Sequence, residues 1–145
     1  MSLKILSVAA YLAMVTGLVA LLVMRSLFSP SWPVIALQIA ALFLFFWARI
    51  TFGRRSFHLA ANPTEGGLVT TGPYRYIRHP IYTAMTLFVG AGAAAHLSWK
   101  TALVFGLVLA GALMRVYCEE ILIVQRYPEY KQYASATSRM VPYVF

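Results

Sequence analysis

Residues 3–24 read LKILSVAAYLAMVTGLVALLVM, an apolar run with no charge after Lys4. A hydrocarbon core about 30 Å thick is crossed by about 20 helical residues, so this run is long enough to span a membrane. It is also too long for the apolar part of a signal peptide, and no A-x-A-like cleavage site follows it. We therefore predict an uncleaved transmembrane helix over residues 3–24.

Further apolar stretches predict helices over residues 33–52, 81–97 and 101–125. Pro30 and Pro33 mark the break before the second helix, because proline is favoured in turns and at the first position of a helix. The third helix contains the small-residue run GAGAAA at 90–95, whose face should pack closely against a neighbour. The sequence thus predicts an all-α membrane bundle of four transmembrane helices, formed by one domain over residues 1–145.

The composition excludes a soluble globular domain. Hydrophobic residues make up 61% of the chain and charged residues 11%, whereas soluble domains carry about 25% charged residues. The net charge of +8 would suggest a nucleic-acid partner in a soluble protein. Membrane proteins gather Lys and Arg for topology alone, so we expect no such partner. Cys118 is the single cysteine and the three histidines are scattered, so we expect no metal site.

Basic residues are distributed unevenly between the two ends of the predicted bundle. With four spans, the N-terminus, the segment 53–80 and the C-terminal tail share one side, and Arg25 and Lys100 lie on the other. Arg49 and Arg115 fall inside helix ends. The shared side carries eight basic residues: Lys4, Arg54, Arg55, Arg75, Arg78, Arg126, Lys131 and Arg139. Basic segments stay in the cytoplasm, so we expect both termini there, in a membrane such as the prokaryotic inner membrane.

The connection from Gly53 to Pro80 is much longer than the other two connections between predicted spans. Loops of this length in compact domains are usually functional or disordered. Its second half, residues 66–80, reads GGLVTTGPYRYIRHP, with Pro, Tyr and Arg in place of the Gly and Ser of a flexible linker. We therefore predict a structured cytoplasmic segment there.

Two of the four carboxylates in the chain, Glu119 and Glu120, are adjacent near the end of the fourth span. Ionisable residues at the edge of a span are costly and mark functional sites. Glu119 lies one helical turn after Arg115, so a simple i,i+4 ion pair would also explain it. Glu120 points about 100° away from that pair. The residues alone leave both interpretations open.

The segment RHPIY at 78–82 also has simple structural interpretations. His79 would cap a helix that is entered through Pro80. Arg75 and Arg78 would be topology charges near the headgroups, and the tyrosines of this segment would lie in an interfacial belt.

Taken together, these pieces resemble the isoprenylcysteine carboxyl methyltransferase and phospholipid methyltransferase superfamily. That family has a pattern of GPYR-x-x-RHPxY, then EE, then YxxY, then R-x-x-P. The sequence has GPYRYIRHPIY at 72–82, the pair Glu119–Glu120, and a tail with Tyr130, Tyr133, Arg139 and Pro142. The resemblance covers residues 66–142. It departs from the family at Ala84, where glycine is common, and the chain is shorter than the eukaryotic members.

The resemblance implies methyl transfer from S-adenosylmethionine at the cytoplasmic membrane face, with a cofactor site in residues 66–142. The loop and helix residues that would enclose the cofactor are Gly72, Tyr74, His79, Pro80 and Tyr82. Glu119 and Glu120 would hold its polar end, the tail helix with Tyr130 and Tyr133 would close over it, and Arg126 would lie near the reacting group.

The chemistry of the methyl acceptor is open at this stage. A lipid-like carboxylate, as in an isoprenylcysteine, is ionised at neutral pH and would only need Arg126 or Arg78 to orient it. An amine or thiol would need a base such as His79 or a glutamate, Glu120 included. Two alternatives are a small four-helix transporter or scaffold and a related NADPH-dependent membrane reductase. A charge near the middle of a span would favour the transporter. A Gly-rich dinucleotide fingerprint would favour the reductase. Neither signal is evident in the sequence. The oligomeric state is not predicted.

Overall fold

The computed structural model describes residues 2–53 and 67–144, and within these residues the chain is helical, without strands. Its elements are α1 (Leu3–Val23), α2 (Trp32–Phe52), the 3₁₀ helix η2 (Gly72–Arg75), α3 (Pro80–Ala95), α4 (Trp99–Arg126) and α5 (Tyr130–Ala136). The predicted basic residues Arg54 and Arg55, and the first part of the long connection, lie outside the described residues.

Each of the four predicted apolar stretches forms a helix. α1, α2 and α4 are long and apolar enough to cross a membrane. α3 has 16 residues, about 24 Å at 1.5 Å per residue, and is shorter than a full span. Its predicted extension to residue 97 is wrong, because the helix ends at Ala95 and His96 leaves helical geometry to bond the carbonyl oxygen of Phe28 at 2.7 Å.

α4 begins two residues earlier than predicted because of a capping box. The Ser98 hydroxyl accepts from the amide of Thr101 at 3.2 Å, and the Thr101 hydroxyl accepts from the amide of Ser98 at 2.8 Å. This reciprocal pairing satisfies two donors that a helix N-terminus otherwise leaves open. Trp99 and Lys100, which precede the predicted fourth helix, are therefore the first residues of α4.

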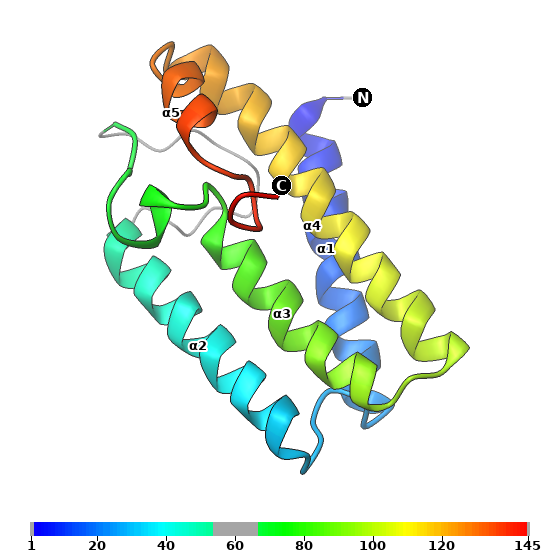
Figure 1. Cartoon of the computed structure of the whole chain (residues 1–145). Helices are drawn as coiled ribbons and strands as arrows, with labels where there is room; N and C mark the ends of the chain where they lie inside the picture. Colours follow the sequence, from blue (N-terminus) through cyan, green and yellow to red (C-terminus); the bar gives the residue numbers. More distant parts are fainter. Residues whose placement is uncertain (1, 54–66, 145) are drawn as a thin grey trace.

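The helices pack as neighbours in the order α2, α3, α4, α1 (Figure 1). Small residues allow the close contacts. A Cβ on Gly111 would lie 2.8 Å from the carbonyl oxygen of Ala10 in α1, and a Cβ on Gly92 would clash with the backbone of Leu27. The prediction that the small-residue run 90–95 packs against a neighbour is confirmed, and that neighbour is the turn between α1 and α2.

A buried side-chain amide, that of Gln38, holds the turn between α1 and α2 in place. Gln38 of α2 donates from Nε2 to the carbonyl oxygen of Leu27 at 2.7 Å and to that of Phe88 in α3 at 3.3 Å. Backbone carbonyls inside an apolar bundle need such donors, because an unsatisfied one costs free energy. Gln38 therefore joins α2, α3 and the α1–α2 turn at one end of the molecule.

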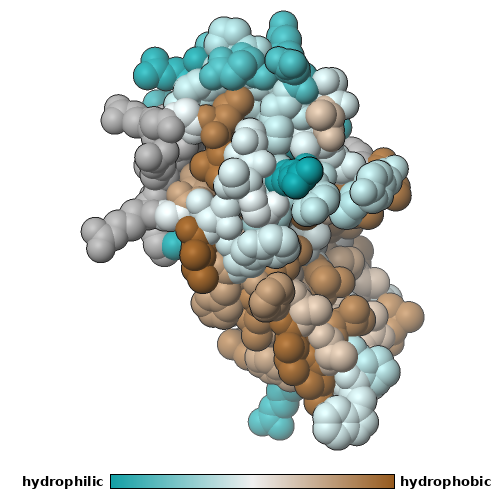
Figure 2. Space-filling model, turned by 60° about the vertical axis from the view of Figure 1, so that its left-hand side comes forward, coloured by the Kyte–Doolittle hydropathy of each residue, from teal (hydrophilic) through white to brown (hydrophobic). Residues whose placement is uncertain are grey.

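The opposite end of the molecule is a polar cap made by η2, the residues that lead into α3, α5 and the C-terminal tail (Figure 1). Figure 2 shows hydrophilic residues gathered over this cap, above a body that is mostly hydrophobic. Arg25 lies in the turn after α1 and Lys100 in the first turn of α4, both at the other end, so for the described residues the predicted separation of the basic residues between the two ends matches the fold. Which end faces the cytoplasm stays a prediction.

Candidate functional site

The cap is held together by pairing between two segments that are far apart in the sequence. The amide of Arg78 donates to the carbonyl oxygen of Ser138 at 2.8 Å, and the amide of His79 donates to that of Arg139 at 2.9 Å. Ser138 forms a parallel bridge with Ile77. The tail is thereby placed beside the RHP segment, where α3 begins.

The turn before this segment explains two of the predicted cofactor residues. Gly72 has a φ of +57°, and a Cβ there would lie 2.6 Å from the Thr51 hydroxyl of α2. Only a glycine combines that backbone with that approach. The turn buries Tyr74, and its carbonyl oxygen accepts a bond from the Tyr133 hydroxyl of α5 at 2.5 Å.

Glu120 is the centre of an ion-pair cluster under the cap. Its Oε1 accepts from Arg78 Nε at 2.9 Å and from the Tyr130 hydroxyl at 3.2 Å, and its Oε2 accepts from Arg139 Nε at 2.9 Å. The side chains of Glu120 and Arg78 are 16% and 8% exposed. Charge-assisted bonds of this kind are strong, so Glu120 connects α4 through Oε1 to Arg78 and α5 and through Oε2 to the tail.

Arg78 has further bonds that fix its position. Its Nη1 donates to the carbonyl oxygens of Ala134, at 2.8 Å, and Thr137. The guanidinium therefore connects the end of α5 to Glu120. This arrangement uses Arg78 as a structural anchor of the cap.

Glu119 forms a second cluster on the neighbouring face of α4. Its Oε1 accepts from the Tyr82 hydroxyl and from Arg115 Nη2 at 3.2 Å. The Tyr82 hydroxyl in turn accepts from Arg115 Nε at 2.7 Å. The structure gives Glu119 Oε2 no hydrogen bond among the described residues, because its neighbour there, His79 Nδ1, is 3.7 Å away.

His79 lies between the two carboxylates. Its side chain is 5% exposed, and its Nε2 is 3.4 Å from Glu120 Oε1. Nε2 has no hydrogen-bond partner within the described part of the chain. A buried polar atom without a hydrogen bond is costly, and this nitrogen is such an atom, next to the Glu120 carboxylate.

The two α5 tyrosines keep their protons at neutral pH. Burial raises the pKa of Tyr133 to about 12 despite the nearby charge of Arg78. Burial and the charge of Glu120 raise the pKa of Tyr130 above its ordinary value. Both phenols therefore act as hydrogen-bond donors that hold α5 against the rest of the cap.

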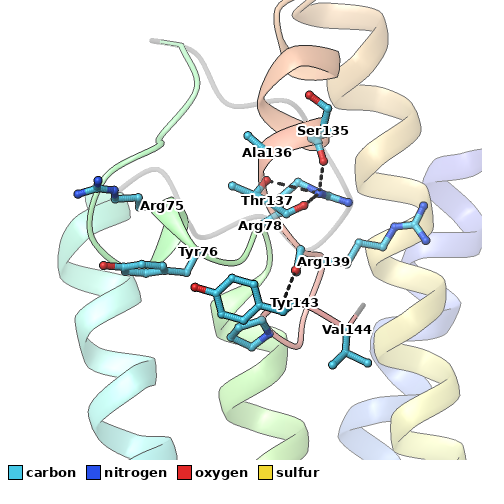
Figure 3. A pocket seen from close by; sticks show the side chains of 12 residues that line it. Arg75, Tyr76, Arg78, Ser135, Ala136, Thr137, Arg139, Tyr143 and Val144 are labelled. Atoms are coloured by element: carbon cyan, nitrogen blue, oxygen red, sulfur yellow. Dashed lines mark hydrogen bonds between the residues drawn. The ribbon is translucent and has the colours of Figure 1, made fainter.

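A hollow of about 470 Å³ opens beside the Glu120 cluster (Figure 3). It lies between the segment around Tyr76 and the tail, and Tyr76 and Tyr143 are both among its lining residues (Figure 3). Its lining also includes Arg78 and Arg139, both bonded to Glu120. The hollow and the ion-pair cluster thus share a wall.

Most of the predicted site residues come together. Contacts join five of them between the start of α3 and α4, namely Arg78, His79, Tyr82, Glu119 and Glu120, and Pro80 directly follows His79. Gly72 and Tyr74 lie in η2 against Thr51 and Phe52 of α2. Arg126 is the last residue of α4 and is exposed, about 9 Å beyond Glu120 along the helix axis at 1.5 Å per residue. No contact described for the chain joins Arg126 to this group.

Arg115 is the important residue that the sequence reasoning underrated. It was expected inside a helix end, as a simple partner of Glu119, but it is 4% exposed and also bonds Tyr82 of α3. The available signal was its position, since a charged residue within an apolar span is costly unless it has partners.

Comparisons with known proteins give a family for this chain. A family model described as the isoprenylcysteine carboxyl methyltransferase (ICMT) family matches residues 33–125. The nickel-cobalt-cadmium resistance protein NccN of Alcaligenes xylosoxydans xylosoxydans is 37% identical over 78 residues, which are 52% of this chain and 36% of that protein. The chain thus spans about a third of the length of this relative. No solved structure matches the chain.

Proposed function

The chain belongs to the isoprenylcysteine carboxyl methyltransferase family, and from this premise we propose that it transfers a methyl group from S-adenosylmethionine to a lipid-like acceptor at the cytoplasmic membrane face. Family membership suggests a membrane methyltransferase, and the long apolar helices support a membrane protein. The cofactor and the acceptor class are the parts that we add.

The observation that carries the proposal is the pair of unsatisfied atoms between α3 and α4. Glu119 Oε2 and His79 Nε2 lack hydrogen bonds among the described residues, although both lie in the polar cluster. S-adenosylmethionine offers a cationic sulfonium, an ammonium group and ribose hydroxyls. A carboxylate oxygen and an imidazole nitrogen are suitable partners for such groups, so the residues fit the cofactor.

The two glutamates then have different tasks. Glu120 is already bonded to two arginines and a tyrosine, so we assign it to holding the tail. Glu119 keeps one oxygen open and its side chain is 22% exposed, so we assign it to the cationic part of the cofactor.

The hollow beside Glu120 would receive the nucleoside part of the cofactor. Its volume of about 470 Å³ lies within the range of about 300–1,000 Å³ that is usual for ligand sites. The rings of Tyr76 and Tyr143 offer an aromatic wall for a base (Figure 3). Residues of the end of α5 and of the tail form much of its lining, whereas Tyr130 and Tyr133, which were expected to close over the cofactor, are not among the lining residues.

S-adenosylmethionine, when bound, supplies a methyl group activated by the sulfonium charge. The protein contributes positioning of the acceptor and exclusion of water. A carboxylate acceptor needs no base. For an amine or thiol acceptor, His79 Nε2 is the buried nitrogen with capacity to take a proton. Arg78 is bonded to Glu120 and to backbone carbonyls, so Arg126 is the better candidate to orient an acceptor.

Methyl transfer tests the proposal directly. The purified protein in phospholipid nanodiscs would receive methyl-labelled S-adenosylmethionine and an S-prenylated cysteine with a free carboxylate. The matched control is the same compound already blocked as its methyl ester, and phosphatidylethanolamine tests an amine acceptor. We expect label in the organic extract with the free carboxylate and none with the ester. Absence of transfer to every acceptor, in protein shown to be folded, would refute the proposal.

A further inference from the structure

Arg115 is a charged residue buried deep in the bundle. It is 4% exposed and lies about 24 Å along α4 from Trp99, at 1.5 Å per residue. With Trp99 near one interface, that depth is inside a hydrocarbon core about 30 Å thick. A guanidinium at such a depth needs partners for its donors and its charge.

Three helices supply those partners. Nε donates to the Tyr82 hydroxyl of α3 at 2.7 Å, and Nη2 donates to Glu119 Oε1 of α4 at 3.2 Å. Nη1 donates to the carbonyl oxygen of Ser7 in α1 at 3.4 Å. The guanidinium also lies over the ring of Tyr11 in α1, with 5.4 Å from its carbon to the ring centroid. The part of the Arg115 guanidinium that does not face Tyr82 and Glu119 is therefore held by α1.

The register of α1 against α4 is well determined. A Cβ on Gly111 would lie 2.7 Å from Met14 Cγ, and a Cβ on Gly17 would lie 2.5 Å from Val108 Cγ2. Such close approaches leave little freedom for sliding, because packed interiors respond to even one added methyl group. The packing of α1 against α4 therefore fixes the positions of the Ser7 carbonyl and the Tyr11 ring beside Arg115.

We propose that α1, which lies outside the family match at residues 33–125, is part of the functional site: Ser7 and Tyr11 position Arg115, and Arg115 positions Tyr82 and Glu119. The proposal rests on the proposed function where it says that Glu119 faces the cofactor. Tyr11 and Arg115 are positioning residues, since they act through Glu119 and Tyr82.

The geometry explains why arginine is needed at this position. Its planar fork offers separate donors to three acceptors from three helices, whereas a lysine offers one compact ammonium. The aromatic ring of Tyr11, from α1, stabilises the cation over its face. Loss of that ring removes the contact on one face of the guanidinium, and the Tyr82 hydroxyl and Glu119 Oε1 then lose part of what fixes their orientation.

The test compares Tyr11→Leu, which removes the ring, with Tyr11→Phe, which keeps it. Leu12→Ala is the matched control, because Leu12 is 56% exposed on the same helix. The first readout is the carbon-13 resonance of the Tyr82 ring in ligand-free protein, assigned with Tyr82→Phe. We expect Tyr11→Leu to shift or broaden that resonance, while Tyr11→Phe and Leu12→Ala leave it in place.

The second readout is the dissociation constant for S-adenosylhomocysteine. We expect about fivefold to tenfold weaker binding in Tyr11→Leu and near wild-type binding in Tyr11→Phe, a magnitude between those of an exposed and a desolvated cation–π contact. An unchanged Tyr82 resonance in Tyr11→Leu would overturn the positioning role, whatever the ligand does. A wild-type protein that binds no S-adenosylhomocysteine, with the resonance still dependent on the Tyr11 ring, would instead refute the proposed function alone.

Discussion

Replacing Glu120 by glutamine should loosen the cap more than it disturbs the bundle. Glutamine keeps the shape but removes the charge that faces Arg78 and Arg139. Arg139 has a side chain that is 46% exposed, so its pair contributes little, about 0–1 kcal/mol. Arg78 is 8% exposed, and exchanging its charge-assisted bond for a neutral one costs about 1–2 kcal/mol. We expect Glu120→Gln to reduce the free energy that holds the cap closed by about 2 kcal/mol in total.

That free energy predicts a measurable change in local opening. A loss of about 2 kcal/mol raises the open population of the tail about 30-fold, since 1.4 kcal/mol is about a factor of ten. Trypsin reports this opening, because Lys131 and Arg139 lie in the cap, and cleavage follows the open population when reclosing is fast. In detergent, the tail of Glu120→Gln should therefore be cut about 30-fold faster than that of the wild type.

The matched variant is Glu119→Gln, which removes the neighbouring charge on the same helix. Glu119 bonds Tyr82 and Arg115 and has no contact with the tail among the described residues. In Glu119→Gln the tail should therefore be cut at the wild-type rate, while the affinity of this variant for S-adenosylhomocysteine should fall. Equal cutting rates for Glu120→Gln and the wild type, or faster cutting in Glu119→Gln, would contradict the division of tasks between the two glutamates.

Three further changes test the packing and the cap. Gly92→Ala places a methyl group against the backbone of Leu27, so thermal unfolding in detergent should show a loss of about 1–3 kcal/mol with no faster cutting of the tail. Gly72→Ala puts a side chain at a positive φ and 2.6 Å from the Thr51 hydroxyl; a loss of about 1–2 kcal/mol is expected from the backbone alone, measured as faster cutting of the cap. Burial raises the pKa of Tyr133 to about 12, above its ordinary value of about 10. The folded cap thus favours the protonated phenol. The contribution of Tyr133 to the stability of the cap is fully present below pH 10 and is lost as the pH rises from 10 to 12. In unfolding measured against pH, Tyr133→Phe should therefore show a smaller loss of stability over this range.

The helical body was largely predictable because its signal is local. An apolar run of sufficient length predicts a spanning helix whatever surrounds it, and α1, α2 and α4 follow that rule. The end of α3 was not predictable in the same way. His96 is drawn out of the helix by the carbonyl of Phe28, a partner that lies far away in the sequence.

The site was predictable in membership and much less so in roles. The motif around His79 and the adjacent Glu119 and Glu120 indicated side chains that the structure brings together; their function stays a prediction. Spacing on one helix says which face a residue occupies, but its partner on another helix depends on the packing. Arg78 was therefore expected to orient an acceptor, whereas the structure bonds it to Glu120 and the backbone of the tail.

The most direct test of the account is the thermal stability of the detergent-purified protein with S-adenosylhomocysteine, with NADPH as the control. A ligand at 100 times its dissociation constant stabilises the folded state by about 2.7 kcal/mol. We predict a clear upward shift of the unfolding temperature with S-adenosylhomocysteine in the wild type, a much smaller one in Glu119→Gln, and none with NADPH. A shift with NADPH alone, or no shift with either ligand in folded protein, would contradict the assignment of a methyltransferase site.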